Sequence, residues 1–376
     1  MFVRIIVVIC ESSMKKAPVN EAGFISKMLI IWYDKHKRDL PWRKSTDPYI
    51  IWVSEIILQQ TRVDQGKDYF ERFTGRFPDI SSLANASEDD VLKYWQGLGY
   101  YSRARNMHTA AKMIVEKYDG IFPADYKTIL SLRGIGEYTA AAIASFVWNQ
   151  PCPVVDGNVF RVLARLFAID TPVDTTAGKK IFFDLAGSIL DPQYAGVHNQ
   201  AIMEFGALQC VPRNPECLIC PLMNICIAYA SGEVQNYPVK RHKTKTRNRY
   251  FHYFYIVYNG YTWLHRREGK DIWNGLYEFP LIETESPMDF SQLQQTAAFQ
   301  ELFRQAGRLT ISTSNLPIKH VLSHQVLYAR FYRVELNGQL DSLDNYLRVL
   351  QQDIDQYAIP RLIHIYLENL DRKLPD

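Results

Sequence analysis

Long hydrophobic runs are missing from this sequence of 376 residues. Its most apolar start, MFVRIIVVIC, has five consecutive apolar residues after Arg4 and is followed by Glu11 rather than by the small residues of a signal-peptide cleavage site. No other window approaches the roughly 20 apolar residues that span a bilayer. These absences argue against a membrane or secreted protein and predict a cytoplasmic one. We expect residues 1–20 to be disordered or wrongly annotated, with the true initiator at Met14.

A strong charge imbalance is also missing, because 43 Lys and Arg face 40 Asp and Glu and leave a net charge of +3. This balance neither requires nor excludes a nucleic-acid partner, so the distribution of charge must decide. The sequence has no internal repeat and no low-complexity tract. Hydrophobic residues at 47% and charged residues at 22% are typical of a globular protein, and the length predicts two to three domains.

Cysteine is scarce, with six residues in the chain, yet four of them fall within CVPRNPECLICPLMNIC at residues 210–226. A reducing cytoplasm argues against disulfides, and four isolated buried thiols at this spacing would be a coincidence. Four thiolates suit structural zinc or an iron–sulfur cluster. A single Cys-x-x-Cys pair, Cys217 and Cys220, is flanked by the single residues Cys210 and Cys226. This asymmetry favours a cluster and leaves zinc as the alternative.

Residues 21–230 carry helical patterns almost throughout. Asp47 followed by Pro48 predicts a helix start, and Ser87–Asp90 predicts another. Apolar residues recur at three-to-four spacing, which predicts helices, in residues 102–119, 137–148, 157–168, 177–190 and 194–209.

The character of the chain changes after Cys226. Residues 231–249 are predicted to form an interdomain linker. Its end, KRHKTKTRNR, holds six basic residues and no acid, which is typical either of a solvated connector or of a segment that contacts phosphates. Two aromatic runs joined by Asn259-Gly260 predict a β-hairpin. Further patterns predict helices at 289–306 and 359–370 and a strand at 325–336. Residues 250–376 therefore form a separate α+β domain.

Two carboxylates and one glycine turn are the candidates for chemistry. Glu55 lies on an apolar helical face, where desolvation raises a carboxyl pKa and favours a proton donor; a Glu paired with a buried Arg is the alternative. Asp156 is a second carboxylate or a helix N-cap, and paired carboxylates fit glycosidic cleavage. Gly134 and Gly136 form a turn before a helix, which either binds a phosphate or only connects helices.

The order of these features resembles a known superfamily. A glycine hairpin, an aspartate about twenty residues later and Cys-x6-Cys-x2-Cys-x5-Cys resemble the endonuclease III superfamily, and three motifs resemble its adenine DNA glycosylase (MutY-type) branch: LPWR at 40–43, WVSEIILQQT at 52–61 and GLGYYSRARN at 97–106. The resemblance implies an all-α helix-hairpin-helix domain with a 4Fe–4S cluster loop at 210–226, followed by a smaller α+β Nudix-like domain.

The resemblance also implies roles for single residues. Glu55 would protonate adenine at N7 and later activate water, Asp156 would stabilise or capture the sugar cation, and Tyr138 and Asn158 would position these groups. Glu204 would belong to the adenine pocket, although a partly buried structural acid is an equal reading. Further implied residues are Trp52 in the adenine pocket and the cluster ligands Cys210, Cys217, Cys220 and Cys226.

DNA contacts are implied in both domains. In the helical domain, Gln60 and Tyr100 match intercalating positions and Thr61 lies beside the first, whereas core packing is the alternative for Tyr100, with Tyr101 facing DNA instead. Gly134 and Gly136 would meet the phosphates.

The second domain resembles a Nudix-like module without its metal box, because LYEFPLIETESPMDF follows Gly275. We therefore expect a reader rather than a hydrolase. His320–His324 matches a lesion-recognition loop, with Leu322 in place of a phenylalanine and with Ser323 and His324 as hydrogen-bonding groups. An ordinary strand-edge turn is the alternative.

The expected function is removal of adenine mispaired with 8-oxoguanine or guanine by a monofunctional glycosylase. Tyr138 stands where lyases carry a lysine, and no lysine lies between Lys127 and Lys179. A bifunctional lyase and a non-catalytic iron–sulfur DNA-binding protein are the alternatives. The expected partner is double-stranded DNA, without a membrane, and we expect a monomeric bacterial protein.

Overall fold

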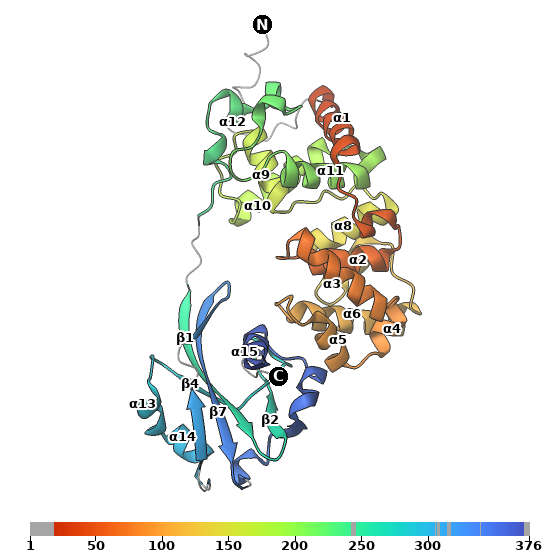
Figure 1. Cartoon of the computed structure of the whole chain (residues 1–376). Helices are drawn as coiled ribbons and strands as arrows, with labels where there is room; N and C mark the ends of the chain where they lie inside the picture. Colours follow the sequence, from red (N-terminus) through yellow and green to blue (C-terminus); the bar gives the residue numbers. More distant parts are fainter. Residues whose placement is uncertain are drawn as a thin grey trace. The chain divides into compact units, whose positions relative to one another are not determined.

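The computed structural model describes residues 19–241, 246–304, 306, 309–313, 317–338 and 340–371. Residues 1–18 and four residues of the predicted linker, 242–245, lie outside this description. The chain forms two compact units, one from the described residues of Met1–Thr74 and Ala110–Lys243, the other from Gly75–Thr109 and Thr244–Asp376 (Figure 1). No described helix is both long and apolar enough to cross a membrane.

The first unit is helical, as the sequence predicts. Two of its helices, α3 and α6, continue into the second unit. Its helices are α1 (Val19–His36), η1 (Pro41–Lys44), α2 (Pro48–Leu58), α3 (Val63–Arg76), α6 (Ser102–Tyr118), α7 (Tyr126–Ser131), α8 (Glu137–Trp148), α9 (Gly157–Leu166), α10 (Thr176–Ile189), η2 (Pro192–Tyr194), α11 (Ala195–Leu208), η3 (Cys217–Ile219), η4 (Met223–Ile225), α12 (Ile227–Ala230) and η5 (Val234–Asn236).

Local capping explains where the helices that carry the site begin. Asp47 accepts a hydrogen bond from the Tyr49 N–H at 2.8 Å, and Pro48 occupies the first position of α2. Asp156 caps α9 in the same way. The helix α11 packs against α1, α8 and α9, and α2 packs against α8. The core of the first unit includes Leu29, Leu163 and Phe205, each at most 2% exposed.

One close approach fixes the spacing of α9 and α11. A Cβ on Gly206 would lie 2.6 Å from the Asn158 Cβ and 2.9 Å from the Asn158 carbonyl oxygen. Only glycine therefore allows α11 to pass this close to the first turn of α9.

The second unit combines two short helices, the first part of α6 and an α+β portion. Its further elements are α4 (Ile80–Asn85), α5 (Glu88–Trp95), β1 (Arg247–Val257), β2 (Tyr261–Arg266), β3 (Tyr277–Glu278), β4 (Leu281–Thr284), α13 (Phe290–Gln294), α14 (Ala297–Leu302), β5 (Leu309–Thr313), β6 (Ile318–Val321), β7 (Gln325–Leu336), η6 (Asp341–Leu343), β8 (Leu347–Leu350), η7 (Gln351–Gln356) and α15 (Arg361–Asp371).

The central pair of the α+β portion is β1 and β7, which run parallel over their length with Phe251 opposite Ala329 (Figure 1). One sheet has the order β4-β1-β7-β5, with β6 also paired to β7, and the other has the order β3-β2-β8. Phe251 and Tyr253 share a core with Ile363 of α15, whereas Phe254 packs with Phe299 and Phe303 on the opposite side.

Three predictions for this portion need correction. Asn259 and Gly260 do form a turn with positive φ of 48° and 81°, but beyond the bridge Tyr258–Tyr261 the strands β1 and β2 join different sheets. β7 pairs with β1 along its length and β4 pairs with Tyr250–Tyr253, whereas β2 pairs with β3 and β8. The helix predicted at 289–306 is broken into α13 and α14, because Thr296 caps a new helix by accepting from the Phe299 N–H. In addition, β1 begins at Arg247, within the segment predicted as linker.

Candidate active site and cluster loop

The buried carboxyl of Glu55 is the centre of the candidate site. Glu55 is 7% exposed on α2, and the Tyr138 hydroxyl of α8 donates to its Oε2 at 2.8 Å. Burial raises the pKa of Glu55 to about 7, the Tyr138 hydrogen bond lowers it in part, and the negative charge of Asp156 raises it again. Burial also raises the pKa of Tyr138 well above its usual value, so the phenol keeps its proton and donates.

Asp156 is held by the first turn of α9. Its Oδ1 accepts from the backbone N–H groups of Asn158 and Val159 at 2.8 and 2.7 Å, and its Oδ2 accepts from the Asn158 amide at 2.9 Å. Burial raises the pKa of Asp156 although these hydrogen bonds oppose the shift. The carboxylate is an N-cap and at the same time a second acid whose charge reaches Glu55.

Asn158 connects this carboxylate to the cysteine loop. Its Oδ1 accepts from Arg161 at 2.9 Å, and the same guanidinium donates to the carbonyl oxygens of Cys210 at 2.8 Å and Gly206 at 2.6 Å. The orientation of Asp156 therefore depends on α9, on α11 and on the start of the loop at Cys210.

A pocket opens beside Glu55. It is lined by Trp42, Arg43, Ser45, Ile51, Ser54, Glu55, Phe146, Gln200 and Met203. Trp52, predicted for an adenine pocket, is not among the lining residues and is fully buried with its ring against Tyr49 and Phe122. The prediction for Trp52 is therefore corrected: consecutive helical residues point about 100° apart, so Ile51 lines the pocket and Trp52 lies in the core.

Glu204 is saturated by two arginines that the sequence reasoning did not single out. It is 1% exposed, and its two oxygens accept hydrogen bonds at 2.7–3.0 Å from the Arg38 and Arg43 guanidiniums and from the Arg38 N–H. Burial alone would raise the pKa of Glu204, but these hydrogen bonds lower it to about 2. These five hydrogen bonds leave no acceptor site on Glu204 for a ligand. Of Glu204 and its two arginine partners, Arg43 is the one that lines the pocket. The signal that could have found it is the Arg of LPWR together with a buried Glu that needs a cation.

The predicted DNA-contact residues of the first unit lie at helix ends. Gln60 is exposed beyond the end of α2 with a positive φ of 59°, and Thr61 follows it. Gly134 takes a positive φ of 78° in the turn between α7 and α8, and Gly136 occupies the N-cap of α8 without a side-chain cap. The first N–H groups of α8 are thus left without a capping side chain, as an anion-binding turn requires.

The remaining predicted contact residues belong to the second unit. Tyr100 is 49% exposed and Tyr101 is 5% exposed, so Tyr101 and not Tyr100 packs in the core. The Tyr100 hydroxyl is hydrogen-bonded to the Ser323 hydroxyl. Ser323 and His324 are exposed in a turn closed by the Leu322 N–H, which donates to the Gln325 carbonyl at 2.8 Å. This turn lines a cavity together with residues 97–102 and 271–274.

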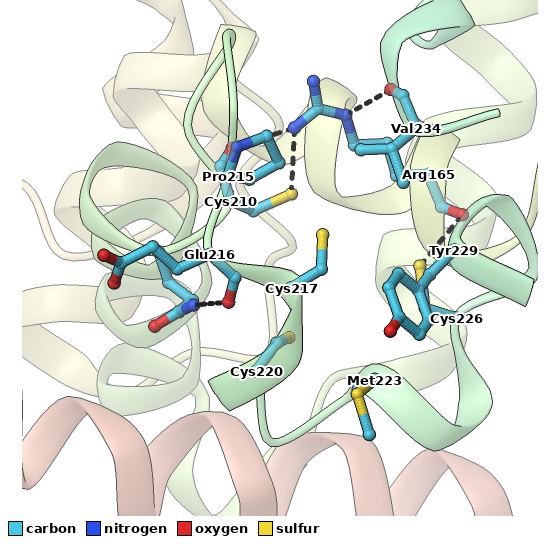
Figure 2. A pocket seen from close by; sticks show the side chains of 11 residues that line it. Arg165, Cys210, Pro215, Glu216, Cys217, Cys220, Met223, Cys226, Tyr229 and Val234 are labelled. Carbon is cyan, nitrogen blue, oxygen red and sulfur yellow. Dashed lines mark hydrogen bonds between the residues drawn. The ribbon is translucent and has the colours of Figure 1, made fainter. Parts of the chain in front are cut away.

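The four loop cysteines surround one cavity in the first unit (Figure 2). In the described part of the chain, no three His, Cys, Asp or Glu side chains gather closely enough to hold a metal ion. Sulfurs spaced around a cavity fit a cluster, which fills the space with its own iron and sulfide. They fit a single zinc less well, since its thiolates converge to about 2.3 Å from one centre.

Arg165 fixes the loop around this cavity. It is 2% exposed and donates to the Val234 carbonyl oxygen at 2.9 Å and to the Cys210 Sγ at 3.4 Å (Figure 2). It also donates to the carbonyl oxygens of Val211 and Pro212 at 2.7 and 2.9 Å. A buried guanidinium beside the cavity also supplies positive charge next to thiolates.

Comparison with known proteins gives family matches over both parts of the chain. Residues 53–181 match the HhH-GPD superfamily of base excision DNA repair proteins, residues 210–226 match the iron–sulfur binding domain of endonuclease III, and residues 252–369 match the NUDIX domain. The loop is thus an iron–sulfur binding domain, and the cofactor of this chain is a 4Fe–4S cluster. Cys210, Cys217, Cys220 and Cys226 stay the predicted ligands of this cluster.

Individual relatives agree with these matches. The chain is similar to the adenine DNA glycosylase of Buchnera aphidicola subsp. Acyrthosiphon pisum (strain APS), with 38% identity over 68% of this chain and 73% of that protein. It is similar to the adenine DNA glycosylase of Homo sapiens, with 34% identity over 85% of this chain and 68% of that protein. Among solved structures, a thermostable thymine-DNA glycosylase matches with a TM-score of 0.53 and 26% identity over 56% of this chain and 98% of that one.

Proposed function

We propose, from the premise that this chain belongs to the adenine DNA glycosylase family of HhH-GPD base excision repair proteins, that it hydrolyses the N-glycosidic bond of adenine mispaired with 8-oxoguanine or guanine in duplex DNA. The observation that carries the proposal is the state of Glu55. Its carboxyl is buried beside a pocket, accepts a hydrogen bond from the neutral phenol of Tyr138 and has a pKa raised to about 7. Such a group is half protonated at neutral pH and suits general-acid catalysis.

Glu55 is the proton donor in this proposal. Adenine leaves far more readily when a ring nitrogen is protonated, and a buried carboxylic acid beside the pocket can supply that proton. After departure of the base, the Glu55 carboxylate accepts a proton from the water that attacks the sugar. Tyr138 holds the carboxyl through the 2.8 Å hydrogen bond in both states.

Asp156 meets the positive charge that develops on the sugar. A second carboxylate near the first is the arrangement that glycosidic cleavage through an oxocarbenium-like state uses. The hydrogen bonds from Asn158 and Val159 fix the orientation of Asp156 before the reaction.

Arg43 is the residue that we propose for recognition of the flipped adenine. Its terminal nitrogens donate to the Arg38 carbonyl and to Glu204, and in the described part of the chain its Nε–H and one terminal N–H remain without an acceptor. Adenine offers ring nitrogens as acceptors for such donors. Glu204 orients Arg43, which is a positioning role rather than contact with the base.

The cluster loop has a structural part in this proposal. When bound, the cluster cross-links four thiolates and so keeps one conformation of the loop. Arg161 and Arg165 then hold the loop against α9, and through Asn158 the same bonds reach Asp156.

The geometry favours a monofunctional enzyme over a glycosylase with lyase activity. A lyase needs an amine that forms a Schiff base with the sugar, but the residue bonded to Glu55 is Tyr138, and no lysine lies between Lys127 and Lys179. A phenol cannot form an imine.

The exposed pair Ser323 and His324 is the proposed reader of the opposite base. Oxidation converts guanine N7 from an acceptor to a donor and adds a carbonyl at C8. One well-placed hydrogen bond discriminates bases by about 1–3 kcal/mol.

Incubation with duplexes carrying adenine opposite 8-oxoguanine, with and without alkali, tests the proposal. We expect strand cleavage only after alkali treatment and no efficient trapping of the enzyme on DNA by borohydride. Absence of adenine release would contradict the proposed activity, and efficient trapping would replace it with the bifunctional alternative.

A further inference from the structure

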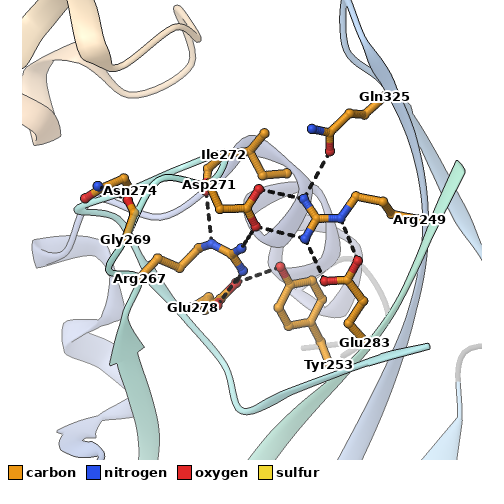
Figure 3. A network of polar contacts seen from close by, with 10 residues as sticks. All are labelled: Arg249, Tyr253, Arg267, Gly269, Asp271, Ile272, Asn274, Glu278, Glu283 and Gln325. Atoms are coloured by element: carbon orange, nitrogen blue, oxygen red, sulfur yellow. Dashed lines mark hydrogen bonds and ion pairs between the residues drawn. The ribbon is translucent and has the colours of Figure 1, made fainter. Parts of the chain in front are cut away.

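A buried arginine lies behind the exposed turn of the second unit. Arg249 of β1 is 7% exposed and forms paired hydrogen bonds with Glu283 of β4 at 2.6 Å and with Asp271 at 2.8 Å (Figure 3). Against the effect of burial, the hydrogen bonds from Arg249 and from the Ile272 N–H lower the pKa of Asp271 to about 2. The arginine therefore ties a strand edge to the segment that contains Asp271.

The fifth hydrogen bond of Arg249 reaches the turn itself. Its guanidinium donates to Gln325 Oε1 at 3.0 Å, and Gln325 directly follows His324 at the start of β7 (Figure 3). All five N–H donors of Arg249 are then used, so the guanidinium has one orientation in which every donor is satisfied.

A second arginine stiffens the same network. Arg267 donates to both oxygens of Glu278 at 2.7 and 2.8 Å and to Asp271 at 2.6 Å, and the Tyr253 hydroxyl donates to Glu278 at 2.8 Å. Asp271 is shared by both arginines. Movement of Arg249 out of this network would thus leave its own buried charge without partners, which is costly.

The turn is anchored on both sides of its exposed pair. On one side, Leu322 packs against the core that contains Phe251 and Leu327. On the other side, the Arg247 N–H donates to the His324 carbonyl at 3.1 Å, and Gln325 is held by Arg249. Ser323 and His324 are exposed between these anchors, and Ser323 is also hydrogen-bonded to the Tyr100 hydroxyl. The direction of the exposed pair therefore depends on the anchors and on this hydrogen bond rather than on burial in a core.

We propose that Arg249 is a positioning residue that, through Gln325, fixes the turn Leu322–Gln325 and thereby sets the preference for adenine opposite 8-oxoguanine over adenine opposite guanine. This inference rests on the proposed function. Recognition groups must be held within about 0.5 Å of the productive geometry, and a flexible turn would contact both bases equally poorly.

Gln325→Leu is the variant that tests the anchor, because it removes one bond and leaves Arg249 paired with Asp271 and Glu283. A hydrogen bond to a charged group is stronger than one between neutral groups, so its loss should loosen the turn measurably. We expect the ratio of single-turnover rates on the two duplexes to fall roughly fivefold. Gln325→Glu keeps an acceptor for Arg249 and should restore the ratio.

Gln351→Leu is the matched control. Gln351 Oε1 accepts from the Tyr255 hydroxyl at 2.7 Å, so this substitution removes a comparable glutamine bond away from the turn. The control should keep the wild-type ratio, and all three variants should melt within a few degrees of the wild type.

The outcomes separate the inference from the function on which it rests. If the wild type releases no adenine, or releases it equally from both duplexes, the proposed function fails and the positioning role with it. If the wild type shows the preference and Gln325→Leu retains it, only the positioning role is overturned. Equal losses in Gln325→Leu and Gln351→Leu would also overturn it, because they would reflect general destabilisation.

Discussion

Two regions of the first unit bury a glutamate in opposite ways. In the Glu55 region, formed by Glu55, Tyr138 and Asp156, the carboxyl accepts a hydrogen bond from a neutral phenol, and burial raises its pKa to about 7. In the Glu204 region, formed by Glu204, Arg38 and Arg43, two guanidiniums lower the pKa to about 2 despite burial. The difference lies in the cations and not in the depth of the carboxyl.

The comparison shows which buried acid can do chemistry. An acid without a hydrogen-bonded cation keeps a proton that it can donate, whereas an acid bonded to two arginines is ionised and determines the position of its partners. The network around Arg249 in the second unit follows the second pattern, with Asp271 held ionised by arginines.

The largest effect is expected for Glu55→Gln on adenine release. The amide keeps the size of the side chain and an acceptor for Tyr138 but cannot deliver a proton, so the single-turnover rate should fall by roughly two to four powers of ten. Binding to the mismatched duplex should change little. Appreciable cleavage by the variant would assign the acid to another group.

The same substitution should change stability in opposite directions in the two regions. Glu55 has a folded pKa above its unfolded value, so its contribution to stability is full below about pH 4.5 and is lost as the pH rises through about 7. At pH 8 Glu55→Gln should therefore raise the free energy of unfolding by up to about 3 kcal/mol, since one pKa unit corresponds to about 1.4 kcal/mol.

The substitution of Glu204 should change the free energy of unfolding in the opposite direction. The folded pKa of Glu204 is lowered, so its stabilisation is present above about pH 4.5 and disappears as the pH falls through about 2. Glu204→Gln should lower the free energy of unfolding at pH 8 by about 3 kcal/mol, because Arg38 and Arg43 lose a buried partner. Melting temperatures of the two variants at pH 8 and pH 5 provide the test, and shifts of the same sign would contradict the comparison.

A smaller effect is expected on the pH dependence of the rate. Only protonated Glu55 donates, so the single-turnover rate should be constant well below about pH 7 and fall up to tenfold per unit above it. Tyr138→Phe removes the hydrogen bond that lowers the pKa of Glu55, so the midpoint should move to higher pH. Tyr126→Phe, a phenol in the same core without this bond, should leave the midpoint unchanged. A midpoint that moves downward in Tyr138→Phe would refute the assigned cause.

The helices of residues 21–230 follow from local patterns in the sequence. Asp47 and Pro48 start α2, and Ser87 caps α5 by accepting from the Asp90 N–H at 3.1 Å, as the sequence predicts. The turn at Asn259-Gly260 also forms where predicted, but the pairing of β1 does not, because β7 lies more than sixty residues away in the chain.

The site could also be predicted only in part, because its contacts join residues that are far apart in the sequence. A buried Glu55 on an apolar face follows from helical spacing, and so does the neighbouring Trp52, but the pattern does not tell which of Ile51 and Trp52 faces the pocket. The state of Glu204 depends on Arg38, which is 166 residues away. Distant partners decide the charge of a buried acid, and a sequence pattern does not contain them.

The most direct test of the central claim is a carboxyl ¹³C NMR titration of the DNA-free protein, with the Glu55 and Glu204 signals assigned from the two Gln variants. The account predicts that Glu55 titrates with a midpoint of about 7 and that Glu204 stays ionised over the same pH range. A Glu55 signal that is already ionised at about pH 5, near the behaviour of an ordinary glutamate, would contradict it.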